Sequence, residues 1–205
     1  MSGIAGFCDY CDNLTEEAPL WGALVKRMCN KLCHRGFAGT HARVSAHTAL
    51  GYAALEVSEG NDASAEGKRG EGRISVVLDG KFRNAAELKR ELQSLGCRFQ
   101  SGNDAELLLW CYLQFGYFCA EKLNGAFAFV IEDETLDCTF LCRDQLGLKP
   151  LYYSKQGDRL VFGSEIKALF EYPGILPCLD AGGLQELFLF GPVRLPGSGV
   201  FYGIR

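Results

Sequence analysis

The chain has 205 residues, of which 48% are hydrophobic and 22% are charged, a composition typical of one folded domain or a close pair of domains. Its net charge of −4 argues against a nucleic-acid or anionic-membrane partner. The longest charge-free apolar run, residues 107–120, is shorter than the ~20 residues of a membrane span, and the N-terminus lacks the basic region of a signal peptide. We therefore expect a single domain over residues 1–205, located in the cytoplasm.

Apolar spacing predicts both strands and a helix in the first part of the chain. Residues 3–9 are expected to form a buried strand, and residues 19–33 an amphipathic helix with apolar side chains at helical spacing. Residues 47–57 are expected to form a strand. This strand leads into residues 59–73, which are rich in small and charged residues and are expected to form a loop.

The rest of the chain is expected to contain a strand that ends in a turn, then two helices, then two hairpins. The strand is predicted at 74–78 and its turn at Asp79-Gly80. The helices are predicted to begin at Asn84 and at Asn103 or Asp104, and the hairpins to span 125–142 and 152–162. Two strand-rich blocks separated by adjacent helices favour a layered α+β domain.

Ten cysteines in a chain without a secretory signal are expected to be reduced and mostly buried. Cys29 and Cys33, four residues apart, are expected to lie buried on one helix face with no metal and no disulfide. An alternative is a zinc site made by Cys8, Cys11, Cys29 and Cys33, because the gap between the two pairs is similar to that of zinc ribbons.

Six sequence strings resemble, in chain order, the N-terminal glutaminase domain (class II glutamine amidotransferase) of glutamine-hydrolysing asparagine synthetases. They are GIAGF at 3–7, HRG at 34–36, GNDAE at 102–106, LNGAFAF at 123–129, RDQLGLKPLYY at 143–153 and FGSEIKAL at 162–169. The resemblance implies a four-layer αββα sandwich of the N-terminal-nucleophile hydrolase type, with no metal or cofactor. It also implies that the strands 3–9 and 74–78 lie side by side and bring Ser2 and Gly80 to one cleft.

The resemblance places the catalytic groups at three positions. Family members use a cysteine at position 2, exposed by removal of Met1, as the nucleophile and its own α-amine as the base; this chain has Ser2, a far weaker nucleophile. The Asn-Gly-Glu turn of the family, which binds the oxyanion, is Asp79-Gly80-Lys81 here. The carboxylate of Asp79 is an acceptor where a donor is needed, and loss of such a donor costs ~2.7–4 kcal/mol of transition-state stabilisation.

The resemblance also implies a set of substrate-binding positions. Ala54 stands where the family has an arginine for the α-carboxylate of glutamine, and Leu55 and Val57 follow it. Lys81 reverses the charge of the glutamate that faces the substrate ammonium, whereas Asp104 matches the second acidic ligand of that ammonium. Glutamine or another small amide is therefore expected to bind weakly at most.

These substitutions favour a glutaminase domain that is impaired or inactive and acts as a binding or scaffolding module. We expect Lys81 to pair with Asp79 or with Asp104 and to fill the substrate pocket. The alternative is an amidohydrolase with Ser2 as nucleophile and a different amide as substrate. The phosphate loop of ATP pyrophosphatases does not occur in the sequence, so we expect the C-terminal ATP-dependent synthetase domain to be absent, and a separate synthetase domain or a second copy of the chain to be the partner.

Overall fold

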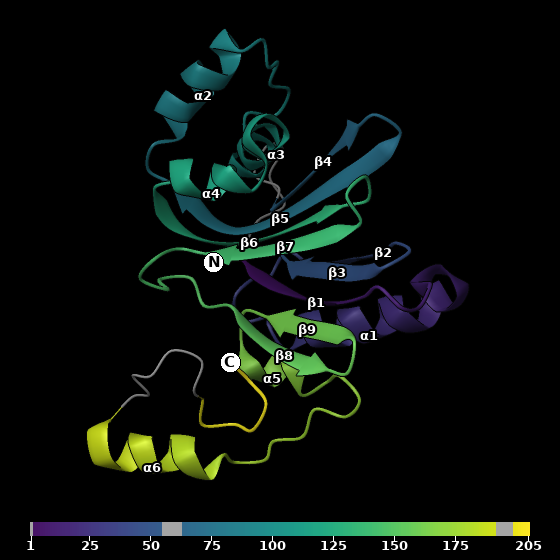
Figure 1. The fold of residues 1–205 in the computed structure, drawn as a ribbon, viewed down its shortest axis with the longest axis vertical. Coiled ribbons are helices and arrows are strands. Elements are labelled where there is room, and N and C mark those ends of the chain that lie inside the picture. The colour runs from purple at the N-terminus through teal and green to yellow at the C-terminus, as the bar shows by residue number, and fades with distance from the viewer. Residues whose placement is uncertain (1, 55–62, 192–198) are drawn as a thin grey trace.

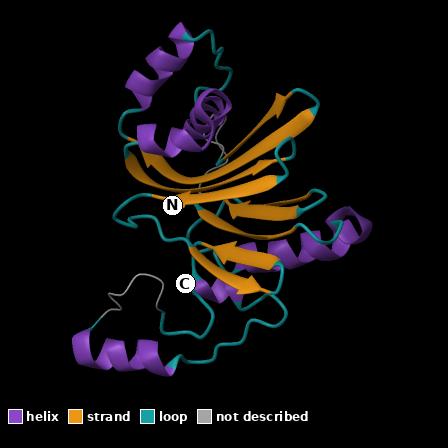
Figure 2. Cartoon of the chain, in the orientation of Figure 1, coloured by secondary structure: helices purple, strands orange, loops and turns teal. Residues whose placement is uncertain are grey.

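The structure is a computed structural model that describes residues 2–54, 63–191 and 199–205. Its strands form two antiparallel sheets that lie face to face, and helices cover both outer faces (Figure 1, Figure 2). This order of layers confirms the predicted α+β class and the four-layer αββα sandwich.

The first sheet has the strand order β2-β3-β1-β9-β8. Its strands are β1 (Gly3–Asp9), β2 (Thr40–Val44), β3 (Thr48–Ala53), β8 (Tyr152–Gln156) and β9 (Arg159–Gly163), and its helices are η1 (Leu14–Glu17), α1 (Ala18–Asn30) and α5 (Ile166–Leu169). Every residue of β1 is buried, because this strand has a neighbour on each side, α1 on one face and the second sheet on the other.

The second sheet has the strand order β4-β5-β6-β7. Its strands are β4 (Ser64–Arg69), β5 (Gly72–Phe82), β6 (Gly125–Asp133) and β7 (Cys138–Arg143), and the helices on its outer face are α2 (Ala85–Ser94), α3 (Asp104–Phe115), η2 (Gly116–Phe118) and α4 (Cys119–Lys122).

The pleat of β5 decides which of its side chains reach the space between the sheets. Ile74 and Val76 are buried in the core under α2 and α3, whereas Val77 packs with Ile4 of β1 in the small core between the sheets. Since side chains alternate along a strand, Asp79 also points into the layer between the sheets.

Four predictions about the elements are wrong in detail. The strand predicted at 74–78 does not end in a turn at Asp79-Gly80, because β5 continues through both residues to Phe82 and is paired there with β6. The predicted loop 59–73 contains β4 and the first residues of β5; its polar alternation is that of an edge strand with an exposed face. The helix predicted at 19–33 ends at Asn30. The strands β1 and β5 do not pair side by side, because they belong to opposite sheets that stack face to face.

The last helix, α6 (Ala181–Phe190), lies apart from the sandwich (Figure 1). Its sequence is apolar over most of its length, yet Phe188, Leu189 and Phe190 are exposed. Within the described ranges, no helix combines the length and the apolar character that a bilayer crossing requires.

Candidate functional site

Ser2 lies at the entry to β1, directly opposite β5 of the second sheet. The backbone nitrogen of Ser2 donates to Asp79 Oδ1 at 3.2 Å. The start of β1 is held in register because Ile4 N donates to Ser164 Oγ at 2.9 Å, while Ser164 N donates to Ile4 O at 2.8 Å. The structure therefore brings position 2 to Asp79 and Gly80, which lie within β5.

Asp79 is fully buried and is bound by two cations. Arg35 Nη2 donates to Asp79 Oδ2 at 2.7 Å, and Lys149 Nζ donates to Asp79 Oδ1 at 2.8 Å. The side chains of Arg35 and Lys149 are themselves only 9% and 14% exposed, so this charge cluster is largely shielded from water. Both Asp79 oxygens are occupied by groups of the protein.

The ion pairs predicted for Lys81 do not form among the described residues. Lys81 is exposed, Asp79 is taken by Arg35 and Lys149, and Asp104 Oδ2 accepts from Phe82 N at 3.1 Å. The prediction was wrong because it paired neighbours in sequence, whereas the cations that reach Asp79 come from distant parts of the chain.

Arg35 connects three parts of the site from the turn that follows α1. Its Nη2 binds Asp79, its Nε donates to Ser2 O at 3.0 Å, and its Nη1 donates to Glu165 Oε1 at 3.3 Å. One planar guanidinium thus fixes the backbone at Ser2 and the carboxylate opposite it.

Glu165 is bound by a second group of side chains at the more exposed side of the cluster. His34 Nε2 lies 2.8 Å from Glu165 Oε1, and Lys167 Nζ lies 3.1 Å from Oε2. Burial alone would raise the pKa of Glu165, but the hydrogen bonds from Lys167, His34 and Arg35 outweigh it and lower this pKa. Glu165 is therefore held as a carboxylate beside Arg35.

Asp144 holds the loop that delivers Lys149. Its carboxylate accepts from the backbone nitrogens of Leu146, Leu148 and Lys149 at 3.1, 3.0 and 3.0 Å, and from Phe127 N at 3.3 Å. Burial would raise the pKa of Asp144, but these backbone donors outweigh it and lower the pKa. Asp144 thus positions Lys149 although it does not contact Asp79.

Gly80 occupies a position that only glycine fits. Its φ is +141°, and a Cβ atom there would lie 2.1 Å from Ala126 O of the neighbouring strand β6. Ala54, at the expected carboxylate-binding position, is half-buried and is bonded through its backbone to Ala38 and Gly39. Leu55 and Val57 lie outside the described residues.

The comparisons with known proteins show which family the chain belongs to. The model of the glutamine amidotransferase domain matches residues 1–205. The chain belongs to this family. It is 35% identical over 208 residues to asparagine synthetase (glutamine-hydrolyzing) 3 of Bacillus subtilis, covering 100% of this chain and 33% of that protein. Asparagine synthetase (glutamine-hydrolyzing) 1 of the same organism is 29% identical over 175 residues, covering 85% of this chain and 28% of that protein.

Solved structures show the same fold at lower identity. The glutamine phosphoribosylpyrophosphate amidotransferase of B. subtilis matches with a TM-score of 0.64 and 21% identity, over 82% of this chain and 42% of that chain. A structure described as the allosteric regulatory enzyme of purine biosynthesis matches with a TM-score of 0.67 and 21% identity, over 82% of this chain and 43% of that chain. This amidotransferase domain spans about a third of the length of the synthetases it matches.

The site of this amidotransferase domain contains residues to which the sequence analysis assigned no role. Arg35, Lys149 and Glu165 each lie within a string that carries the resemblance, at 34–36, 143–153 and 162–169. Their place inside strings that carry the resemblance was the available signal. Their convergence on Asp79 and Ser2 depends on how the two sheets stack.

The cysteines of the domain do not form a metal site. Cys8 and Cys29 are buried, whereas Cys11 and Cys33 are exposed, and all are free thiols. In the part of the chain that the structure describes, no three His, Cys, Asp or Glu side chains could hold a metal ion, which contradicts the zinc alternative. Burial raises the pKa of Cys29 to about 12. The predicted burial of Cys33 is wrong because α1 ends before it.

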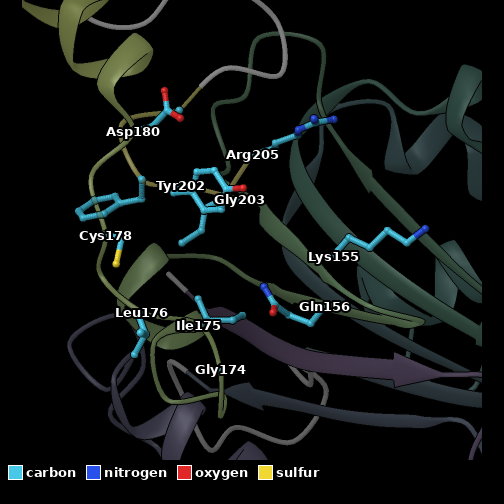
Figure 3. A pocket seen from close by; sticks show the side chains of 13 residues that line it. Lys155, Gln156, Gly174, Ile175, Leu176, Cys178, Asp180, Tyr202, Gly203 and Arg205 are labelled. Carbon is cyan, nitrogen blue, oxygen red and sulfur yellow. The ribbon is translucent and has the colours of Figure 1, made fainter.

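A large cavity of the domain lies away from Ser2. A cavity of about 650 Å³ opens between β8, the segment before α6 and the final residues of the chain (Figure 3). Lys155 and Gln156 lie on one side, and Ile175, Cys178 and Tyr202 on the other (Figure 3). It lies beside the exposed α6.

Proposed function

We propose that the chain is an asparagine-synthetase-type glutaminase domain whose glutaminase activity is impaired or absent and which acts as a binding or scaffolding module. One observation carries the proposal: Asp79, at the oxyanion position, is buried with both carboxylate oxygens bound by Arg35 and Lys149. The residues 1–205 form one amidotransferase-type domain in this proposal, and any ATP-dependent step belongs to another domain.

The charge at Asp79 opposes amide hydrolysis. The tetrahedral intermediate carries an oxyanion, which hydrogen-bond donors stabilise in a site shielded from water. A carboxylate at this position presents a second negative charge instead. Arg35 and Lys149 do not replace the missing donor, because both are already bound to Asp79.

The nucleophile is also poorly activated. Removal of Met1 would turn the Ser2 nitrogen into an α-amine, which must be neutral to accept the proton of the Ser2 hydroxyl. The 3.2 Å contact from this nitrogen to Asp79 Oδ1 favours the ammonium form instead. Ser2 would then lack its base.

The substrate-binding positions point the same way. Without an arginine at position 54, the α-carboxylate of glutamine meets Ala54 and loses the bidentate guanidinium contact, and the cations Arg35 and Lys149 are already bound to Asp79. We therefore expect no saturable glutamine binding in the millimolar range, where a Kd of ~1 mM corresponds to ~4 kcal/mol. Calorimetry that detects sub-millimolar glutamine binding, abolished by Asp104→Ala, would contradict this expectation.

The proposal is tested by measuring ammonia release from glutamine. The parent chain is compared with the quadruple variant Ser2→Cys, Ala54→Arg, Asp79→Asn, Lys81→Glu, after mass analysis has established whether Met1 is removed. We expect the parent to give background release and the quadruple variant to give measurable turnover. The triple variant that retains Ser2 separates the contribution of the nucleophile from that of the pocket. Saturable turnover by the parent would overturn the proposal.

A second candidate is an amidohydrolase that uses Ser2 on a different amide. It is favoured by the half-exposed position of Ser2 at the site, where its backbone is fixed by Arg35 and Asp79. Retention of Met1 excludes this candidate, because the α-amine is then blocked. If Met1 is removed, ammonia release from a panel of primary amides, lost in Ser2→Ala, would favour it over the scaffold.

The scaffolding role needs a partner surface, and α6 provides one. A helix that is apolar nearly all round is normally covered on most sides, yet Phe188 is 79% exposed. The synthetases that the chain matches are about three times its length, so we assign this face and the adjoining cavity to an ATP-dependent synthetase domain. Calorimetry with the C-terminal part of the B. subtilis synthetase should show binding that Phe188→Ser weakens. Light scattering that shows a homodimer of the chain alone would assign the face to a second copy instead.

A further inference from the structure

A second, smaller cavity lies between the two sheets, away from the Ser2–Asp79 cluster. It has a volume of about 190 Å³ and opens between β2 and β3 of the first sheet and β4 and β5 of the second. Leu50 and Val77 give it apolar walls, and Tyr52, Ser64 and Ser75 add hydroxyl groups. Neither the expected glutaminase chemistry nor the α6 surface uses this cavity.

Ser75 is the group that singles out this cavity. Its side chain is 5% exposed, and its Oγ is the one buried side-chain nitrogen or oxygen, within the described residues, that has no hydrogen-bond partner. On β5, Ser75 shares the face of Val77, which packs between the sheets, and not that of Ile74, which packs under the helices. Ser75 therefore stands on the face of β5 that lines the cavity. Buried hydroxyls are nearly always hydrogen-bonded, so an unpartnered one indicates a missing ligand or water.

The cavity also has a flat aromatic wall. The rings of His41 and Tyr52 are stacked, with centroids 4.8 Å apart and planes 16° apart. Tyr52 Oη lies 3.1 Å from Ser64 Oγ, which fixes the position of the phenol ring. A flat ring can therefore pack against this wall while a polar substituent reaches Ser75.

The charges at the rim disfavour an anionic ligand. Arg43 lines the cavity, but its guanidinium is engaged by Glu66 at 3.3 Å, by Glu134 at 2.9 Å and by Glu132 at 3.8 Å. Because three carboxylates surround one guanidinium, the rim presents no uncompensated positive charge to an anion. An anionic ligand would have to displace these carboxylates.

We propose that this cavity is a binding site for a neutral, single-ring aromatic compound that carries one hydroxyl or carbonyl group. The ring packs on the Tyr52 side, and the polar group forms a hydrogen bond with Ser75 Oγ, which can both donate and accept. The size fits, since an apolar cavity of ~150 Å³ holds a benzene molecule. The remaining volume accommodates one polar substituent.

Phenol is the probe, and toluene is its match without the hydroxyl. Both are titrated into the ¹⁵N-labelled full chain and followed by NMR, with calorimetry for affinity. We expect saturable phenol binding at low millimolar concentration or tighter, with shifts centred on Leu50, Ser75 and Val77. Ser75→Ala should weaken phenol binding about 3- to 10-fold, the loss typical of one neutral hydrogen bond, and leave toluene binding unchanged.

Two further variants sharpen the test. Ser75→Leu should abolish binding of both probes, because its side chain occupies the cavity. Ser154→Ala removes a buried hydroxyl on β8 that is bonded to Gln156, and it should leave both affinities unchanged. No saturable phenol binding, or shifts centred elsewhere, would overturn the proposal and assign the cavity to an ordered water only. If Ser75→Leu does not fold, the affinities of Ser75→Ala for phenol and toluene, each compared with those of the parent chain, decide whether the proposal holds.

Discussion

Arg35 and Asp79 form a buried ion pair, 2.7 Å from Nη2 to Oδ2, that joins the turn after α1 to the central strand of the opposite sheet. The two residues are 44 positions apart in sequence. Because the same guanidinium also binds Ser2 O, this ion pair between the two sheets also fixes the position of Ser2, the expected nucleophile.

Replacing Asp79 should destabilise the fold. Asp79→Ala leaves Arg35 and Lys149 buried without their counter-charge, and loss of one partner of a buried ion pair typically costs ~3–5 kcal/mol. Asp79→Asn should cost less, because the amide oxygen can still accept one hydrogen bond. Urea denaturation at neutral pH measures both, with the exposed Glu121→Gln as control, for which a change within ~0.5 kcal/mol is expected. A loss below ~1 kcal/mol for Asp79→Ala would show that the cluster is solvated.

The α-amine of Ser2, in chains from which Met1 has been removed, should have a raised pKa. The carboxylate of Asp79, 3.2 Å away, stabilises the ammonium form, whereas Lys149 and Arg35 on the same carboxylate oppose it. We expect the direct contact to dominate, so the pKa should exceed the ordinary ~7.7–8.0. The pair then stabilises the fold fully below that ordinary pKa, and the contribution is lost as the pH rises through the raised value. NMR titration of the amine measures the shift. Asp79→Asn should return the pKa towards its ordinary value, and an unshifted pKa in the parent would argue against the interpretation.

Glu106 should make the fold sensitive to acid. Its carboxylate accepts from the backbone nitrogens of Gln100, Ser101 and Gly102 at 2.6, 2.8 and 2.7 Å. Burial would raise the pKa of Glu106, but these donors outweigh it and lower the pKa. A carboxyl with a lowered folded-state pKa stabilises the fold above its unfolded-state pKa of ~4.3, and this contribution is lost as the pH falls through the folded-state value.

Glu106→Gln should therefore cost ~2–3 kcal/mol of unfolding free energy at pH 7, and the difference from the parent should shrink as the pH is lowered. Urea denaturation at several pH values follows this change, with Glu121→Gln as the same exposed control. A cost that does not vary with pH would mean that the hydrogen bonds, and not the charge, carry the effect.

Gly80→Ala should destabilise the fold by more than the cost of placing an alanine in a backbone conformation with positive φ. The new Cβ would lie 2.1 Å from Ala126 O, a distance at which one of the two strands must move. Gly70→Ala is the matched control, since Gly70 also has a positive φ, +62°, but has no atom within 4 Å of a built Cβ. We expect ~1–2 kcal/mol for Gly70→Ala, the cost of the left-handed conformation, and a larger loss for Gly80→Ala. Equal losses would show that the strand β6 adjusts freely.

Removing the Ser75 hydroxyl should not destabilise the free protein. Since Ser75 Oγ has no partner among the described residues, Ser75→Ala removes the cost of a buried unsatisfied group and should be neutral or stabilising by ~1 kcal/mol. Ser154→Ala, which breaks a 3.0 Å hydrogen bond from Gln156 Nε2, should destabilise by ~1 kcal/mol. Thermal denaturation compares the two, and a destabilised Ser75→Ala would mean that the hydroxyl is satisfied in solution.

The amino-acid sequence by itself determined the layers and the site to look for. The apolar run of 3–9 predicted the buried β1, and helical apolar spacing predicted α1, because periodicity along the chain reports directly on one buried face. The resemblance to the glutaminase domain indicated that Ser2 and Asp79-Gly80 meet. The sequence pattern did not predict β4, because apolar and polar residues alternate only weakly along a polar edge strand.

The tertiary structure alone decided which groups surround Asp79. Lys81, its near neighbour in sequence, is exposed, whereas Lys149, 70 positions away, reaches Asp79 Oδ1. Strand spacing along one chain segment cannot specify this choice, because it depends on the stacking of two sheets and on the loop that Asp144 holds. The unpartnered hydroxyl of Ser75 is likewise visible only in three dimensions, since hydrogen-bond satisfaction depends on atoms from several strands.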